Sequence, residues 1–150
     1  GDSPALFELI VRASLEMGLD QALANLEQCV SEKRLAWLQA NWVAAAPGTD
    51  PIQEGYRWFY EKYLKLSMPV DGEIVERTPT RMVMRWRNAC PTLDACRKLG
   101  LDTRLVCRQA YHLPAQKFLT RIDPRLRFDR SYEMIRPYTD YCEEIIRVGD

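Results

Sequence analysis

The sequence predicts an α+β domain: a helical N-terminal half, then a four-stranded antiparallel sheet made of two hairpins, with helices between and packed on it. Two observations lead to this prediction. Apolar residues recur at helical spacing up to about residue 66, whereas alternation with a period of two begins near residue 73. The order of patterns is helices, a hairpin, helices and a second hairpin. The length of 150 residues suits one domain, 1–150, with a helical half (1–68) and a sheet and cysteine-containing half (69–150).

Three helices are predicted in the first half. The first covers residues 4–17, and the second runs from Asp20 to about Ala45, with Ser31 as a point where it can divide. The third spans residues 51–66 and is rich in aromatic side chains. Aromatic residues at this spacing indicate a core-facing helix.

The first hairpin is predicted from strands at Glu73–Arg77 and Arg81–Asn88. Alternation in the second strand separates an apolar face from a cationic face. The apolar face consists of Met82, Met84 and Trp86, and the other face of Arg81, Val83, Arg85 and Arg87. The second hairpin is predicted from Leu126–Ile135 and Tyr141–Val148. Its inward residues are expected to be Leu126 and Phe128, with Tyr132 and Met134 as further candidates, in one core with the apolar face of the first hairpin.

Helices are also predicted between the two hairpins. One begins at Cys90-Pro91 and ends before Gly100, since proline favours the first turn and glycine the C-terminal end. The next begins at Thr103 and is expected to break or kink near His112, because Pro114 follows.

Charge and hydropathy exclude several kinds of partner. The chain has 21 basic and 21 acidic residues and a formal net charge of zero, so we expect neither a nucleic-acid partner nor an anionic membrane surface. We see neither a run of about 20 apolar residues nor a signal-peptide pattern. Arginines concentrate in residues 121–136, where a solvated face is expected and a local cationic surface is the alternative.

Five cysteines is an odd number, and a chain of this length does not need covalent staples to fold. This favours free thiols, no disulfide and a cytoplasmic location.

Cys90 is the first candidate for chemistry. It follows a strand and precedes a helix, so the helix N-terminus, with Arg85 and Arg87 upstream, would favour its thiolate form as a nucleophile. The alternative is a buried, inert thiol. The single histidine, His112, could serve Cys90 as general base if its helix folds back, or could simply end a helix.

A metal site is an alternative use of the thiols. The candidate ligands are Cys90, Cys96, Cys107, His112 and Cys142. Their irregular spacing contains no Cys-x-x-Cys pair, so the sequence predicts no metal and no cofactor.

The last strand offers an acidic candidate. Cys142 and Glu144 share one face of it, and an inward Glu144 would need a cation, for which the strand arginines are candidates. An arginine-rich inner face could bind a small carboxylate. Cross-strand ion pairing at the surface is the alternative.

Several short motifs together resemble one known family. They are Cys90-Pro91, Arg97-Lys98-Leu99-Gly100-Leu101, Cys107-Arg108, Ile122-Asp123-Pro124-Arg125-Leu126 and Tyr141-Cys142-Glu143. This pattern over residues 81–148 resembles the L-2-amino-thiazoline-4-carboxylic acid hydrolase-like family and related uncharacterised bacterial cytosolic proteins. The resemblance implies opening of a cyclic, sulfur-containing amidine, with Cys90, Cys107 and Cys142 at recurrent cysteine positions. Glu143-Glu144 after Cys142 departs from the family pattern.

The first hypothesis is therefore a hydrolase with a ligand pocket between the sheet and the helices, acting on a C–N bond of a small heterocycle. Cys90 would be the reactive thiol, Arg85 or Arg87 the anion clamp, and His112 or Glu144 the acid-base partner. Cys107 and Cys142 would complete the ligand-binding wall. The second hypothesis is a non-catalytic sensor that binds a small ligand or a metal in the same pocket. The third is an interaction domain whose aromatic helix packs on a partner or on a second copy in a homo-oligomer.

Overall fold

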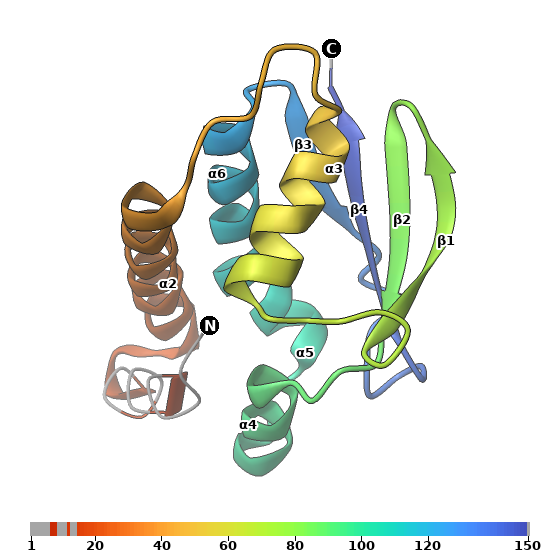
Figure 1. Cartoon of the computed structure of the whole chain (residues 1–150). Helices are drawn as coiled ribbons and strands as arrows, with labels where there is room; N and C mark the ends of the chain where they lie inside the picture. Colours follow the sequence, from red (N-terminus) through yellow and green to blue (C-terminus); the bar gives the residue numbers. More distant parts are fainter. Residues whose placement is uncertain (1–6, 9–11, 13–14, 150) are drawn as a thin grey trace.

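The computed structural model describes residues 7–8, 12 and 15–149. It shows an α+β fold, as the sequence predicts, built on one antiparallel sheet of order β1-β2-β4-β3 (Figure 1). The strands are β1 (Gly72–Thr78), β2 (Arg81–Trp86), β3 (Leu126–Arg130) and β4 (Cys142–Val148). The helical elements are η1 (Leu15–Met17), α2 (Leu19–Asn41), α3 (Pro51–Tyr56), η2 (Arg57–Tyr63), α4 (Pro91–Leu99), α5 (Thr103–Val106), η3 (Cys107–Tyr111) and α6 (His112–Ile122). Most of the helix predicted over 4–17 lies outside the described residues.

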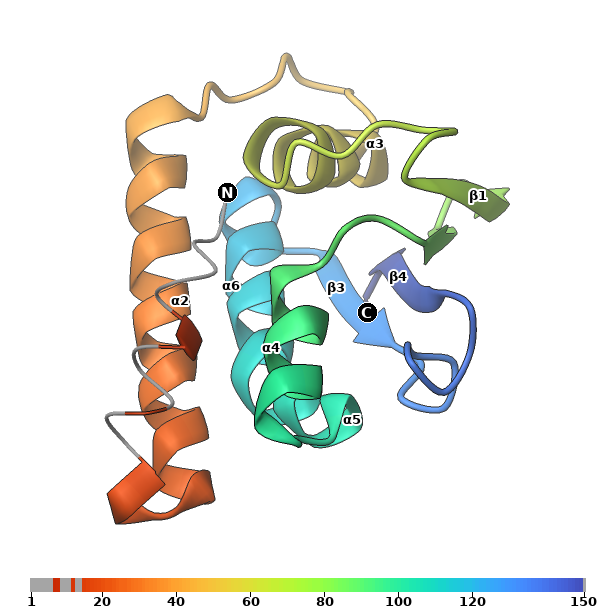
Figure 2. The same ribbon diagram turned by 90° about the horizontal axis from the view of Figure 1, so that it is seen from below.

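The described helices lie on one side of the sheet. Helix α3, its continuation η2, and α6 pack against the sheet, and α2 packs on α6 and η3 one layer further out (Figures 1 and 2). Figure 2 shows none of the described helices on the opposite face of the sheet. We call the helix-covered side the inner face and the other side the outer face.

The main core lies between the inner face and the helices. It contains all five strand residues that the sequence assigns to one core: Met82, Met84, Trp86, Leu126 and Phe128. The aromatic side chains of α3 and η2 are buried in the same cluster, so they are not exposed to a partner. A second cluster joins α2 to α4, α5 and η3 through Leu23, Leu26, Val30, Cys96, Val106 and Ala110.

Helix α2 differs from the prediction at Ser31 and at its C-terminal end. It is continuous through Ser31, whose hydroxyl donates to Glu27 Oε1 at 3.1 Å one turn earlier, and it ends at Asn41 rather than near Ala45. Trp42 is already extended, with ψ of 136°. A single serine whose hydroxyl bonds within the preceding turn does not interrupt a long amphipathic helix.

The break or kink predicted near His112 takes the form of a local distortion, since Tyr111 departs from helical geometry with φ of −120° and ψ of −13°. Helix α5 passes through the π-helical turn η3 directly into α6, and Pro114 is the third residue of α6. A π-turn widens the backbone ladder, which gives room where a proline ring would otherwise meet the carbonyl of the preceding turn.

The third strand is shorter than predicted. It ends at Arg130, and Tyr132 and Met134 lie in the loop that leads to β4. Met134 is 40% exposed rather than inward. Backbone hydrogen bonds from Ser131 N to Glu143 O and from Glu143 N to Met134 O hold this loop against β4 without extending the regular pairing.

One glycine fixes how closely β1 approaches β2. A Cβ at Gly72 would lie 2.5 Å from the carbonyl oxygen of Arg85 and 2.7 Å from the ring of Trp86. Gly72 pairs with Trp86 across the two strands. Only glycine allows this approach, which holds Trp86 in place at the end of β2.

Candidate functional site

A cavity of about 290 Å³ lies between the inner face and the helices. This volume equals that of about ten water molecules in the liquid. Its apolar wall includes Phe59, Tyr60, Leu66, Trp86, Tyr111 and Ile135. Its polar wall includes Arg34, Asn88, Arg130, Arg136 and Glu144. Cys90, Cys107 and Cys142 also line it, so three of the five cysteines share one cavity.

The strand register explains how the sheet residues of the wall come together. Trp86 pairs with Cys142 across β2 and β4, and Glu144 pairs with Arg130 across β4 and β3. Paired residues of neighbouring strands point to the same face, and residues two apart on one strand do so too. All four side chains therefore belong to the inner face.

Glu144 is the centre of a buried hydrogen-bonded group. The Tyr60 hydroxyl donates to its Oε1 at 2.8 Å, and Arg130 Nη2 lies 3.2 Å from its Oε2. The Arg130 and Glu144 side chains are 11% and 12% exposed. Burial is the largest single effect on Arg130 and would lower its pKa. Glu144, together with the smaller effects of Cys107, Tyr132 and Tyr60, outweighs burial, so the pKa is raised. Burial, together with Glu144, raises the pKa of Tyr60 well above 10.0. At neutral pH this group therefore holds a neutral tyrosine and an ion pair.

Two residues of the wall have buried N–H donors for which the described residues supply no acceptor. Arg130 Nε, Arg130 Nη1 and Trp86 Nε1 are buried and have no hydrogen-bond partner within the described part of the chain. Buried donors without acceptors are rare because each costs about 1–3 kcal/mol. Cavities with such donors in the wall are therefore good candidates for ligand sites.

Arg136 holds together the two chain segments at one end of the cavity. Its Nη1 donates to the carbonyl oxygen of Asn88 at 2.6 Å, which ties the β3–β4 loop to the segment before α4. Its Nε and its backbone N both donate to Cys142 Sγ, at 3.2 and 3.4 Å.

Cys90 caps α4 as predicted, with Leu93 N donating to its Sγ at 3.5 Å. The expected thiolate is not supported. Burial raises the pKa of Cys90, and this effect exceeds the opposing ones of the Leu93 hydrogen bond and the Arg136 charge. Burial also raises the pKa of Cys107 to about 12. Both thiols are therefore protonated at neutral pH.

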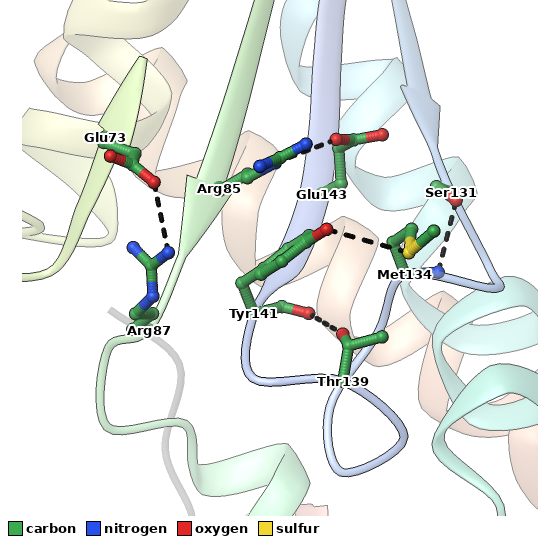
Figure 3. Close-up of polar contacts among 8 residues, drawn as sticks. All are labelled: Glu73, Arg85, Arg87, Ser131, Met134, Thr139, Tyr141 and Glu143. Atoms are coloured by element: carbon green, nitrogen blue, oxygen red, sulfur yellow. Dashed lines mark hydrogen bonds and ion pairs between the residues drawn. The ribbon is translucent and has the colours of Figure 1, made fainter. Parts of the chain in front are cut away.

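Arg85 and Arg87 lie on the outer face, away from the cavity, because they alternate with Met84 and Trp86 (Figure 3). Arg85 Nε lies 3.2 Å from Glu143, and Arg87 Nη2 lies 3.1 Å from Glu73. Both guanidinium groups also stack over the ring of Tyr141, at 4.5 and 5.7 Å. The arginines lie on this face as the alternation predicts, but they form surface ion pairs with carboxylates of neighbouring strands, and these two arginines cannot clamp a ligand in the cavity.

His112 is not among the described residues that line the cavity. Its Nδ1 lies 2.7 Å from the hydroxyl of Tyr132, and its ring meets Phe128 edge-on at 5.2 Å. Burial, assisted by the charge of Arg130, lowers its pKa from 6.5. The structure therefore does not bring His112 into the cavity that holds Cys90.

Sequence reasoning missed the arginines that do reach the cavity. Arg130 lies two residues after Phe128 on the same strand, so the alternation of Leu126 and Phe128 already indicates that Arg130 points inward. Arg34 is 4% exposed and continues the apolar stripe of α2 between Val30 and Leu38. A buried arginine in an apolar stripe is a signal for a pocket, whereas the inward turn of Arg136 depends on loop geometry.

Within residues 7–8, 12 and 15–149, no group of three or more His, Cys, Asp or Glu side chains is arranged to hold a metal ion. The helices described for this chain include none that is both long and apolar enough to cross a bilayer. All five cysteines are free thiols in the structure. The chain matches no protein-family model, no curated protein sequence and no solved structure.

Proposed function

We propose that this protein binds a small organic anion, specifically a carboxylate, in the cavity between the sheet and the helices. The observation that carries the proposal is the set of N–H groups on Arg130 and Trp86 that find no acceptor among the described residues. Carboxylate oxygens are acceptors, and their charge suits a guanidinium. A bound carboxylate would supply the hydrogen-bond acceptors that these N–H groups do not find among the described residues.

The rest of the wall indicates the shape and polarity of the remaining part of the ligand. Trp86 stacks on Tyr60 with ring centroids 4.9 Å apart, and Phe59 and Tyr111 add further aromatic surface to the cavity. Arginines outnumber carboxylates among the described lining residues, with three against Glu144 alone. A flat, apolar body with one anionic group fits this combination of walls.

A titration with benzoate and its neutral analogue benzamide, followed by NMR of the protein, tests this proposal. We expect benzoate to bind more tightly than benzamide. We expect the double variant Arg130→Gln/Glu144→Gln, which removes the buried pair together, to weaken benzoate binding about tenfold or more. The affinity for benzamide should hardly change, because the apolar walls remain.

Arg85→Gln is the matched control, because it removes an arginine of the same sheet that faces away from the cavity. It should leave benzoate binding unchanged. If the folded double variant binds benzoate as tightly as the unmodified protein does, Arg130 does not hold the anion and the proposal fails.

Hydrolysis of a C–N bond in a small heterocycle, by a cysteine thiolate, is a second candidate function. The gathering of Cys90, Cys107 and Cys142 in one wall with Glu144 favours it, because a nucleophile and an acid-base group would face the same ligand. The resemblance to the hydrolase family suggests L-2-amino-thiazoline-4-carboxylic acid as the probe. We expect incubation with the protein to convert it to a product heavier by one water, as measured by mass spectrometry. If no such product forms above the rate without protein, binding without catalysis remains.

A further inference from the structure

Cys142 differs from the other cavity thiols in what contacts its sulfur. Two N–H donors of one residue converge on Cys142 Sγ: the cationic Nε of Arg136 at 3.2 Å and the Arg136 backbone N at 3.4 Å. Cationic donors in contact with a sulfur stabilise the negative charge that it carries as a nucleophile. The same guanidinium is fixed by Asn88, since its Nη1 donates to the Asn88 carbonyl at 2.6 Å and its Nη2 lies 3.4 Å from Asn88 Oδ1.

Among the described residues, no cationic donor is in hydrogen-bond contact with the other two thiols of the cavity. Cys90 Sγ accepts from the neutral backbone N–H of Leu93 at 3.5 Å. Burial raises the pKa of Cys90, and it raises that of Cys107 to about 12. Position at a helix N-terminus, which made Cys90 the first candidate, is therefore outweighed by burial.

A second observation points to a ligand beside Cys142. Trp86 pairs with Cys142 across β2 and β4, is 2% exposed and lines the same cavity. Its Nε1–H is one of the buried donors without an acceptor among the described residues. The thiol and this donor therefore lie in neighbouring parts of one wall.

We propose that Cys142 is the nucleophilic thiol of the cavity, and that Arg136 is the residue that positions and activates it. The inference rests on the cavity being a ligand site, as proposed above, and it assigns the reactive position to β4 rather than to the start of α4. The ligand class is an electrophilic carboxylate, with the carboxylate at Arg130 and the electrophilic carbon at Cys142. In the reaction the sulfur forms a bond to that carbon, the leaving group departs with the electrons of the bond that breaks, and the thiol proton passes to water.

Timed alkylation of the native protein with iodoacetamide, followed by peptide mapping, tests the assignment. The sulfur bonds to the methylene carbon and iodide leaves, so each thiol gains one adduct. We expect Cys142 to react fastest of the three cavity thiols. Cys29 on α2 is half-buried and outside the described cavity lining, so it serves as the reference thiol. Cys96 is 1% exposed and reports on folding, since it should react only if the protein opens.

Arg136→Gln and Arg136→Lys separate activation from structure. Arg136→Gln should slow alkylation of Cys142 about tenfold or more, the factor expected for the loss of one charge-assisted hydrogen bond, and leave Cys29 unchanged. Arg136→Lys should restore part of the rate, because it keeps the charge. If Cys90 or Cys107 reacts faster than Cys142, the assignment is overturned. The same holds if Arg136→Gln leaves the Cys142 rate unchanged while Cys96 stays protected. If Cys96 reacts in Arg136→Gln, that variant is not properly folded. The assignment is then tested by the order in which the thiols of the unmodified protein react and by the Cys142 rate in Arg136→Lys.

Iodoacetate, the anionic counterpart of iodoacetamide, distinguishes this inference from the proposed function. If the cavity favours carboxylates, the rate ratio of iodoacetate to iodoacetamide should be higher at Cys142 than at Cys29. A fast Cys142 without this preference would support the reactive thiol and contradict anion binding. A preference for iodoacetate at Cys142, without fast alkylation of Cys142, would support anion binding and contradict the reactive thiol.

Discussion

His112, the chain's single histidine, lies in a half-buried position beside the hydroxyl of Tyr132. Folding lowers its pKa from 6.5, through burial first and the charge of Arg130 second, so the unfolded chain binds the proton more readily. The contribution of His112 to stability is therefore complete above about pH 6.5. It is lost as the pH falls below that value through the lowered pKa.

We expect His112→Gln to reduce this acid sensitivity. The measurement is the urea unfolding free energy of both proteins at about pH 7.5 and about pH 5. Carboxylates that titrate in the same range are common to both proteins, so the difference between them isolates the histidine. Parallel losses of stability in the two proteins would show that His112 has the same pKa folded and unfolded.

Individual residues also show what local sequence can predict. The cap at Cys90 follows from Pro91 and a strand-to-helix transition, and the structure confirms it. The protonation of Cys90 does not follow from those neighbours, because it depends on burial by residues distant in sequence. Local pattern therefore located the thiol correctly but gave the wrong charge state.

At the scale of the element, β4 separates two adjacent carboxylates. Glu143 lies on the outer face with Arg85, and Glu144 lies on the inner face with Arg130 and Tyr60. Strand alternation predicts that the two point in opposite directions, and the structure confirms it. The two ion pairs join β4 to different neighbouring strands under different degrees of burial.

Glu143→Gln and Glu144→Gln form a matched pair for measuring this difference. Glu144→Gln leaves the buried Arg130 charge without its partner and should cost about 3–5 kcal/mol. Glu143→Gln breaks a more exposed pair and should cost less than about 1 kcal/mol. Equal shifts of the urea midpoint, at equal slopes, would mean that Arg130 finds another partner or that water reaches it.

Helix ends and strand ends were predicted less well than the elements themselves. The regular spacing of apolar residues located the strands and the central part of each helix, because one face of each element is buried. The path through Pro114 and the early end of β3 depended on a π-turn and on a loop hydrogen-bonded to β4, which period counting does not detect. Both segments contribute to the cavity, since η3 carries Cys107 and the loop after β3 carries Arg136.

At the scale of the whole molecule, the sequence predicted the sheet, its inner apolar face and the pocket between sheet and helices. It assigned the wrong arginines to that pocket. Two-residue alternation with Leu126 and Phe128 is enough to place Arg130 on the inner face, but only the packed structure shows that Arg136 turns into the cavity from the loop after β3. Cys142 and Glu144 were placed together correctly, because two-residue spacing on a strand is a local property.

The cavity takes part of its wall from α2, η2, β2, the start of α4, η3, β3, the loop after it and β4. These segments are far apart in the chain, so the cavity exists only while the whole domain is folded. A molecule bound there would act as a non-covalent crosslink between both halves of the chain. At one hundred times its dissociation constant it would stabilise the entire fold by about 2.7 kcal/mol. The abundance of such a protein in a cell would then depend on the supply of its ligand.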